Sequence, residues 1–242
     1  PALNTLAETQ AAPTKDTLLN IKQLLDYAAT NPNAAIKYRA SKMHLWVDSD
    51  AAYLVAPKSW SRVAGYFYLS DVPTQPIQTA PTFNGPILVE CKLLRFVQTS
   101  SSEAEIGGLY HNIKASCPIK LTLQEMGHTQ NATPIKTDNS TAFKYAHNDI
   151  KHRRSKHMDM RYNWIKDRQK LKEYDIYWRP GSENNGDYFS KHHYGITHRI
   201  QRSKHLHKQQ LNLARVYWTC RFEGRQTMAS TASPDQHRPH VY

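Results

Sequence analysis

Carboxylates gather where the sequence predicts strands to end and helices to begin. These acids are Asp48, Asp50, Glu103, Glu105, Asp138 and Asp187. Asp48 and Asp50 are two residues apart, so on a strand they share one face. If the strand that ends at Asp138 lies beside the strand that carries Asp50, the two acids meet at neighbouring strand ends, where sites collect in open sheets. Helices that follow the strands can bring Glu105 and Asp187 to the same place.

Such a cluster of acids predicts a particular chemistry. Carboxylates packed close together repel each other, so they need cations. Oxygen-only ligands favour Mg²⁺ or Mn²⁺ over zinc. Two such ions about 3.5–4 Å apart activate a water and stabilise the leaving oxygen in phosphodiester cleavage. Four carboxylates carry the charge that balances two divalent ions, so the pattern predicts a two-metal hydrolase.

Each acid also has a plainer interpretation. Asp138 has the position of an ordinary cap or turn residue. Asp187 can complement the dipole of the helix it opens, and Gly186 before it is unexpected at a helix start and predicts a loosely held Asp187. We expect Asp48 to face solvent or to orient a neighbour rather than to bind metal.

The two glutamates compete for one capping role. Ser102 and Glu105 have the spacing of a capping box, which would make Glu105 a structural residue. Ser100 and Glu103 have the same spacing, and their pairing would leave Glu105 free. The spacing alone leaves both alternatives open.

The expected elements alternate in an α/β order. A helix is predicted at 16–31, with Asp16 as its N-cap and Leu18, Ile21, Leu24 and Leu25 on one face. Strands and helices then follow in the order strands 42–50, 61–70 and 85–97, helices 100–116 and 117–128, strand 135–137, a short helix, a basic helix at about 155–172, strand 174–180 and a short helix from about 183. This order predicts a mixed sheet.

Composition points to a polyanionic partner. The 242 residues carry a formal net charge of +12, which makes nucleic acid the first candidate. The three cysteines form no CxxC pair, which favours a reducing compartment and argues against a zinc knuckle. The sequence contains no apolar run long enough to predict a membrane span, and no signal for secretion.

The basic helix has two predicted faces. Its cationic stripe, spaced for tracking phosphates, consists of Arg154, Arg161, Arg168 and Lys172. Its core-facing stripe consists of Met158, Tyr162 and Ile165. A merely solvated charged face is the alternative. Near the acids, Ser102, Asn139 and Ser140 are candidates for reading 2′-hydroxyls in a minor groove. Aromatic residues that could stack on bases, although in strands such residues are more often core, are Tyr66, Phe67, Tyr68, Trp164 and Trp178.

Several motifs occur together in a telling order. "VDSDAAYLV", "SSSEAEIGGL", "KTDNSTA", "RSKHMDMRYNW" and "NNGDYFSKHH" resemble the ribonuclease H domain of a copia-type (Pseudoviridae-like) LTR-retrotransposon polyprotein, over roughly residues 16–200. The resemblance implies the α/β ribonuclease H-like fold, with a mixed five-stranded sheet and helices on both faces. Matched by motif, its catalytic and metal-binding acids are Asp50, Glu105, Asp138 and Asp187.

The resemblance also implies an activity and its partners. The expected reaction is hydrolysis of the RNA strand of an RNA–DNA hybrid with two Mg²⁺ ions, or Mn²⁺, leaving a 5′-phosphate and a 3′-hydroxyl. The expected organisation is a segment 1–40 that joins an upstream reverse transcriptase, a ribonuclease H domain at 41–200 and a basic, disordered tail at 201–242. Cytoplasmic virus-like particles, or the nucleus, are the expected location, with no membrane partner.

Two departures keep other functions open. Cellular ribonucleases H carry a histidine in the loop before the last aspartate, whereas "RPGSENNG" has none. A decayed copy that binds hybrid without cutting it is therefore one alternative. A transposase or integrase-type nuclease of the same fold, acting on DNA ends, is the other.

Overall fold

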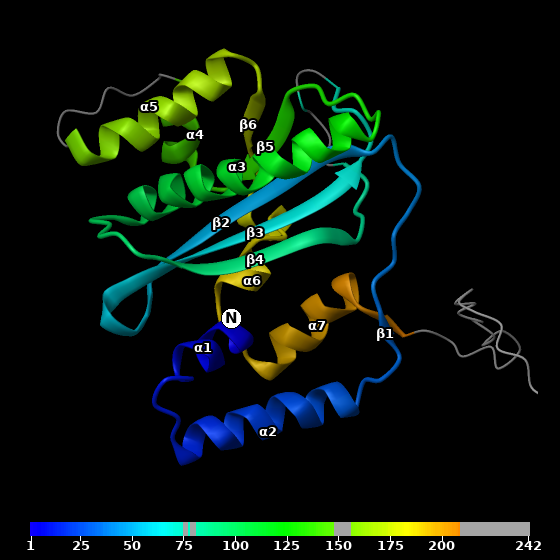
Figure 1. Cartoon of the computed structure of the whole chain (residues 1–242), viewed down its shortest axis with the longest axis vertical. Coiled ribbons are helices and arrows are strands. Elements are labelled where there is room, and N and C mark those ends of the chain that lie inside the picture. Colours follow the sequence, from blue (N-terminus) through cyan, green and yellow to red (C-terminus); the bar gives the residue numbers. More distant parts are fainter. Residues whose placement is uncertain (75–76, 78–80, 148–155, 209–242) are drawn as a thin grey trace, which may run out of the picture. The chain divides into compact units, whose positions relative to one another are not determined.

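A mixed five-stranded sheet lies at the centre of the computed structural model, which describes residues 1–74, 77, 81–147 and 156–208. Its strands are β2 (His44–Ala56), β3 (Trp60–Ser70), β4 (Pro86–Leu94), β5 (Thr133–Thr137) and β6 (Tyr174–Trp178), in the order β4-β3-β2-β5-β6 (Figure 1). β3 is antiparallel to β2 and β4, whereas β5 is parallel to β2 and β6. β5 therefore lies beside β2, which is the condition under which Asp50 and Asp138 come together.

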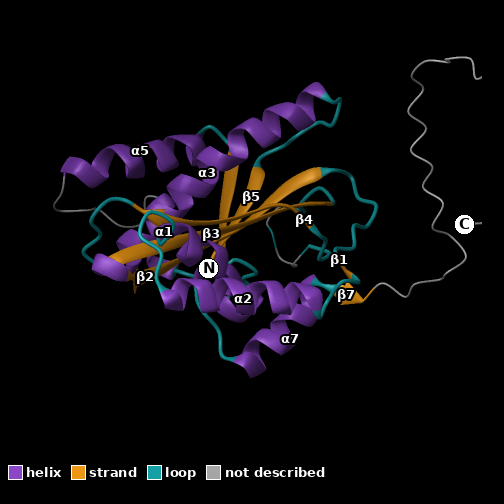
Figure 2. Cartoon of the chain, turned by 60° about the horizontal axis from the view of Figure 1, so that its bottom comes forward, coloured by secondary structure: helices purple, strands orange, loops and turns teal. Residues whose placement is uncertain are grey.

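Helices cover both faces of this sheet. Helices α3 (Ser101–Glu125), α4 (Ser140–Ala146) and α5 (Lys156–Lys170) lie on one side, and α6 (Asp187–Ser190) lies on the other (Figures 1 and 2). Strand residues alternate between the two faces. Leu45 and Val47 of β2 join the core beneath α3, while Trp46 joins an aromatic cluster with Tyr66 on the opposite face. The expected α/β, ribonuclease H-like fold is confirmed.

The helix after β4 is longer than the sequence predicts. The sequence predicts two helices, at 100–116 and 117–128, but α3 is continuous from Ser101 to Glu125 with Pro118 inside it. A proline normally removes one helical hydrogen bond and disfavours the turn before it. Here Ile113 and Leu123, on either side of the proline, are both buried in the core. Burial of the helix on both sides of Pro118 offsets the local cost.

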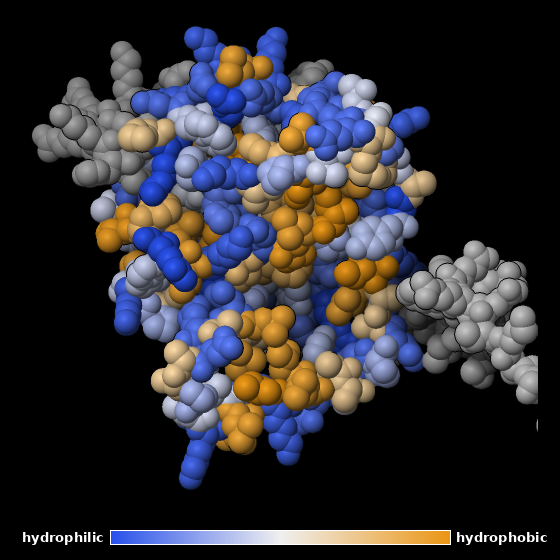
Figure 3. Space-filling view, viewed as in Figure 1, coloured by the Kyte–Doolittle hydropathy of each residue, from blue (hydrophilic) through white to orange (hydrophobic). Residues whose placement is uncertain are grey.

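The N-terminal helices differ in detail from their prediction. α2 (Lys15–Ala29), which follows α1 (Ala2–Glu8), is capped by Thr14 paired with Thr17 rather than by Asp16. The predicted apolar face of α2 is largely uncovered, since Leu18 is 68% and Leu25 is 62% exposed. Apolar atoms are visible around α1, α2 and α7 in Figure 3.

Two elements were not predicted near the C-terminal boundary. Helix α7 (Gly195–His205) runs across the proposed boundary at residue 200, and β7 (His207–Lys208) pairs with β1 (Ala34–Ala35). The last predicted helix is instead a 3-10 turn, η2 (Gly181–Glu183), followed by the short α6; a second 3-10 turn, η1 (Pro57–Ser59), joins β2 to β3. Most of the predicted tail lies outside the described residues. Within the described part of the chain, no helix has the length and apolarity that crossing a membrane requires.

Candidate active site

The parallel pairing of β2 and β5 aligns two of the predicted acids. Asp48 lies opposite Lys136 in the register of these strands, and Asp50 and Asp138 each follow two residues later. Asp50, Glu105 and Asp138 each offer a carboxylate oxygen, and these atoms lie within 4.8 Å of one another. The structure therefore brings together three of the four acids matched by motif.

The capping question at the start of α3 is resolved in favour of Ser100. Its hydroxyl accepts a hydrogen bond from the Glu103 backbone nitrogen at 3.2 Å. The Glu103 carboxylate accepts from the nitrogen and hydroxyl of Thr99 at 2.6 and 2.8 Å. Glu105 is left free of the cap, and its Oε1 lies 3.4 Å from the Ala51 nitrogen, beside Asp50.

Close packing of α3 on the sheet holds Glu105 in place. A Cβ atom on Gly108 would lie 3.2 Å from the Ala51 Cβ and 3.5 Å from the Asp50 carbonyl oxygen, so a larger residue would push the helix outward. Deeper along the helix, the fully buried Asn112 donates hydrogen bonds to the Ser49 hydroxyl at 2.8 Å and to the Ala64 carbonyl at 2.9 Å. These contacts fix the helix against the strand that carries Asp50.

The fourth acid, Asp187, opens α6 but is paired with a lysine. Its carboxylate forms an ion pair with Lys191, and it is not among the three acids whose oxygen atoms gather. It is still near them, because its charge contributes to the raised pKa values of Asp50 and Asp138. Asp187 therefore lies at the rim of the cluster.

Gly186 has a different role from the predicted one. A Cβ atom there would lie 3.1 Å from the Asp50 Cβ and 3.2 Å from the Asp48 carbonyl oxygen. Its backbone has an ordinary helical φ of −62°, so the need for glycine comes from this close approach. The glycine allows the segment to pack directly on β2, and a loosely held Asp187 stays a prediction.

Three of the acids have raised pKa values, as expected for carboxylates that are buried close together. Burial, reinforced by the charges of Asp138 and Asp187, raises the pKa of Asp50 to about 6. Burial and the neighbouring Asp50 and Asp138 raise the pKa of Glu105 well above its usual range, and burial also raises the pKa of Asp138. Within the described residues, the buried atoms Asp50 Oδ2 and Glu105 Oε2 have no hydrogen-bond partner. An oxygen-only donor set of this kind fits Mg²⁺ or Mn²⁺.

Asp48 does not face solvent. It is fully buried and forms an ion pair with Lys136 at 2.9 Å. The expectation that it is exposed to solvent is wrong, and the expectation that it orients a neighbour stays a prediction. Lys136 and Lys191 were not predicted as part of the site, although their spacing from the acids indicates it. Lys136 precedes Asp138 by two residues on a strand, and Lys191 follows Asp187 by one helical turn.

The candidate minor-groove residues lie near the acids. Ser102 is half-buried in the first turn of α3. Asn139, which follows Asp138, is the N-cap of α4 and accepts a hydrogen bond from the Ala142 nitrogen at 2.9 Å. Ser140 is exposed beside it. Their contact with nucleic acid remains a prediction.

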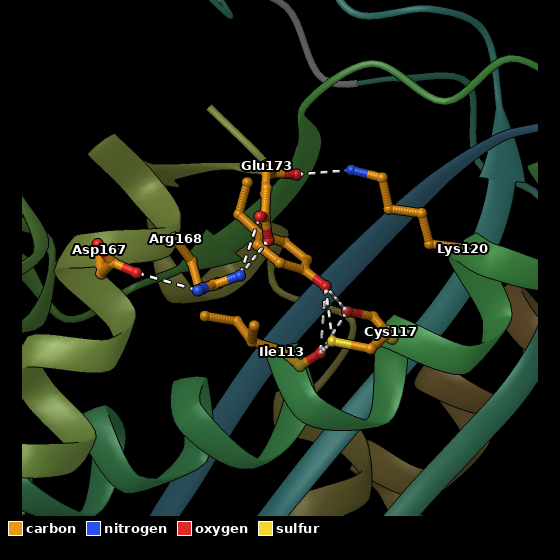
Figure 4. A network of polar contacts seen from close by, with 8 residues as sticks. Ile113, Cys117, Lys120, Asp167, Arg168 and Glu173 are labelled. Atoms are coloured by element: carbon orange, nitrogen blue, oxygen red, sulfur yellow. Dashed lines mark hydrogen bonds and ion pairs between the residues drawn. The ribbon is translucent and has the colours of Figure 1, made fainter. Parts of the chain in front are cut away.

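The cationic stripe is only partly assembled on α5. Arg154 lies outside the described residues. The guanidinium of Arg161 lies 3.7 Å from the centre of the Phe96 ring. Arg168 is paired with Glu173 and Asp167 at 2.9 and 3.0 Å (Figure 4), and Lys172 lies beyond the end of α5 with a positive φ of 58°. Among the three described cations, Arg168 is therefore already paired with acids, and a row of phosphate contacts stays a prediction.

Other side chains of α5 and the sheet behave as core. Tyr162 and Ile165 are 1% exposed, as predicted for the core-facing stripe, and the Met158 side chain lies outside the described set. Among the candidate stacking residues, Tyr66, Phe67 and Tyr68 are also buried, and Trp164 packs against the core. Trp178 differs from these.

Trp178 is exposed and lies opposite Thr137, the residue before Asp138, in the register of β5 and β6. Its side chain is 42% exposed, and its indole nitrogen donates a hydrogen bond to the Asp138 carbonyl at 2.8 Å. The hydrogen bond joins the end of β6 to the end of β5 beside the acids.

Comparison with known proteins supports the motif-based resemblance. The chain is 34% identical over 87 residues to the "Retrovirus-related Pol polyprotein from transposon TNT 1-94" of Nicotiana tabacum. The predicted resemblance to a retrotransposon polyprotein is confirmed. The match covers 36% of this chain, and the chain spans about 7% of the length of that relative. No protein-family model matches the chain.

Solved structures with similar folds are more distant. The N-terminal RNase H domain of a Mycobacterium tuberculosis protein, solved as a maltose-binding-protein fusion, has a TM-score of 0.41 and 8% identity, covering 67% of this chain and 96% of that one. RNase H1 from Halobacterium salinarum has a TM-score of 0.39 and 10% identity, covering 61% and 93%. Because both TM-scores are low, the assignment of the fold rests on the strand order and not on these two structures.

Proposed function

We propose that this chain hydrolyses the RNA strand of RNA–DNA hybrids as the ribonuclease H part of a retrotransposon polyprotein. The observation that carries the proposal is the meeting of Asp50, Glu105 and Asp138, with ligand atoms within 4.8 Å of one another, next to Asp187. The relative matched in sequence is itself a retrovirus-related Pol polyprotein.

The acids would hold two divalent cations, with Mg²⁺ as the first choice and Mn²⁺ as the second. Asp50, Glu105 and Asp138 would supply the central ligands, and Asp187 would join from the rim. When bound, such ions lower the pKa of an attacking water and stabilise the leaving oxygen of a phosphodiester. The unpartnered buried oxygens of Asp50 and Glu105 support this assignment, because buried acceptors of this kind otherwise go unsatisfied.

The surrounding residues would position the hybrid. Ser102, Asn139 and Ser140 would face the minor groove, where 2′-hydroxyls distinguish RNA from DNA. Arg161 and Lys172 would contact phosphates, since neither has an acidic ion-pair partner within the described residues. Arg168 would contribute less, because Glu173 and Asp167 already balance its charge.

The partners of the chain follow from the same proposal. An upstream reverse transcriptase of the same polyprotein would deliver the hybrid, through the segment 1–40 that includes α1 and α2. The domain would occupy residues 41–200 and would act in cytoplasmic virus-like particles or in the nucleus. The uncovered apolar face of α2 is consistent with a connecting role.

Substrate choice tests the proposal. The chain would be incubated with Mg²⁺ and a labelled RNA–DNA hybrid, an RNA duplex or a DNA duplex that carries transposon ends. Cleavage confined to the RNA strand of the hybrid is expected. Cleavage of DNA ends would instead indicate a transposase or integrase-type nuclease. Salt-sensitive binding of hybrid without cleavage, in Mg²⁺ or Mn²⁺, would indicate a copy that binds but does not cut.

A further inference from the structure

A buried ion pair lies directly beneath two of the acids. Asp48 and Lys136 face each other across the parallel strands β2 and β5, 2.9 Å apart, with side chains 0% and 3% exposed. Each precedes by two residues an acid of the cluster on its own strand, Asp48 before Asp50 and Lys136 before Asp138. The pair therefore links the two strands at the point where they present their acids.

The same pair also holds the loop that leads to Asp187. The Lys136 ammonium donates a second hydrogen bond, to the Glu183 carbonyl oxygen at 2.9 Å. Asp48 Oδ2 accepts from the backbone nitrogen of Asn185 at 3.1 Å and from its side-chain nitrogen at 2.6 Å. Asn185 lies two residues before Asp187, so this network reaches the third segment that carries an acid.

The hydrogen bonds of the network argue against a metal-ligand role for Asp48. Its Oδ2 accepts one bond from Lys136 and two from Asn185, and the charge of Lys136 balances its own. Its second oxygen, Oδ1, is buried without a hydrogen-bond partner among the described residues, as are Asp50 Oδ2 and Glu105 Oε2. Asp48 nevertheless is not among the acids whose ligand oxygens lie within 4.8 Å of one another, which are Asp50, Glu105 and Asp138.

Stability alone is a weak reason for such a pair. Removing two charges from water costs about as much as their attraction returns, so buried ion pairs are often neutral for stability compared with apolar replacements. A pair with several directed hydrogen bonds does, however, fix the relative positions of the segments it joins. Here those segments are the ones that carry Asp50, Asp138 and Asp187.

We propose that Asp48, Lys136 and Asn185 are positioning residues, which set the geometry of the cation site without contacting the cations. This inference rests on the proposed function for its activity readout, although its structural readouts do not. Residues that orient metal ligands typically contribute between about 10- and 100-fold to metal affinity or activity. We expect losses in that range when the network is cut.

Asn185→Ala is the sharpest variant, because it removes one hydrogen bond and leaves the ion pair intact. Three quantities would be measured: Mn²⁺ affinity by electron paramagnetic resonance, amide hydrogen exchange across residues 183–189, and the Mg²⁺ dependence of hybrid cleavage. We expect weaker Mn²⁺ binding by about tenfold, faster exchange in that segment and a lower kcat with little change in KM for hybrid. Ser182→Ala, an exposed change in the same loop, is the matched control and should leave all three unchanged.

A second variant covers the ion pair itself. Asp48→Leu combined with Lys136→Met replaces both charges with apolar groups of similar size, a change that buried pairs often tolerate. We expect a folded protein with an unchanged or higher Tm but with the same loss of Mn²⁺ affinity. Wild-type Mn²⁺ affinity and exchange in both variants would overturn the positioning role. If the wild-type chain binds Mn²⁺ but cuts no hybrid, the proposed activity fails while the positioning role is still decided by affinity and exchange.

Discussion

Lys191 forms an ion pair with Asp187, one helical turn before it, at the rim of the acid cluster. Burial alone would lower the pKa of Lys191, but the hydrogen bond that it donates to Asp187 and the charges of Asp50 and Asp138 raise it. In the metal-free protein, the ammonium therefore balances part of the charge that divalent cations would balance. At the proposed site, a cation that binds Asp187 would have to compete with Lys191.

Removing this lysine should strengthen cation binding. Lys191→Ala deletes a positive charge beside the acids and frees the Asp187 carboxylate. We expect Mg²⁺ to bind more tightly, by about three- to tenfold at low salt, because a nearby unit charge at a partly buried site is worth on the order of 1 kcal/mol. Isothermal titration calorimetry measures the change. Lys204→Ala, an exposed lysine on α7, is the control, and equal affinities in all three proteins would contradict the competition.

The raised pKa of Asp50 makes the metal-free protein sensitive to pH. Its pKa rises from an ordinary value near 3.8 to about 6, so its contribution to stability is fully present below about pH 4 and is lost as the pH rises through 6. Asn cannot ionise, so Asp50→Asn should be more stable than the wild type at pH 7.5, by about 2 kcal/mol. Urea unfolding at pH 4 and 7.5 in EDTA measures the difference.

The two pH values give a built-in control for that experiment. At pH 4 the carboxyl of Asp50 is protonated in the wild type, so the two proteins should unfold at similar urea concentrations. A stability gain in Asp50→Asn that is equal at both pH values would mean that ionisation is not its cause.

The two glutamates of α3 should separate stability from activity. Glu103 bonds to Thr99 beside the helix cap, so Glu103→Ala should cost about 0.5–1 kcal/mol of unfolding free energy and leave hybrid cleavage nearly intact. Glu105→Gln should abolish cleavage without loss of stability, because it removes an ionisable group from a buried site. Thermal unfolding and cleavage rates are the measurements. The reverse pattern would make Glu105 the cap residue.

The arginines of α5 should differ in their effect on hybrid binding. Arg161→Ala should reduce the slope of log K against log salt by about one, as expected for the loss of one phosphate contact. Arg168→Ala should change the slope much less, because its guanidinium is paired with Glu173 and Asp167. Binding would be measured by fluorescence anisotropy from 50 to about 200 mM salt. Equal losses in slope would show that Arg168 leaves its acidic partners for the phosphates.

The sequence was most informative where a residue type and an element boundary coincide. Asp50 and Asp138 were found because each was predicted to end a run with strand-like composition. Asp138 does follow the end of β5, whereas β2 continues past Asp50 to Ala56, so the predicted strand end at residue 50 is wrong. The choice between Glu103 and Glu105 was open in the sequence, since both have capping-box spacing. Only the structure shows that the Glu103 carboxylate accepts hydrogen bonds from Thr99.

Long-range contacts explain what the sequence did not predict. Lys136 looked like a polar strand residue, and its role depends on Asp48, 88 positions away. Gly186 looked like a weak helix start, because the sequence does not show its close approach to Asp50, which is distant in the chain. The sequence predicted two helices that meet at residues 116 and 117, but the apolar residues on either side of Pro118 are buried against the same sheet. In each case tertiary packing overrides a correct local preference.

The central claim is that Asp138 and its neighbouring acids hold the catalytic cations for hybrid cleavage. The most direct test compares Mg²⁺-dependent cleavage of a labelled RNA–DNA hybrid by the wild type, by Asp138→Asn and by Asp26→Asn, which alters an exposed acid on α2. We predict RNA-strand cleavage by the wild type and Asp26→Asn and none by Asp138→Asn, with all three proteins folded. Cleavage by Asp138→Asn at the wild-type rate, or no cleavage by any of the three, would contradict the claim.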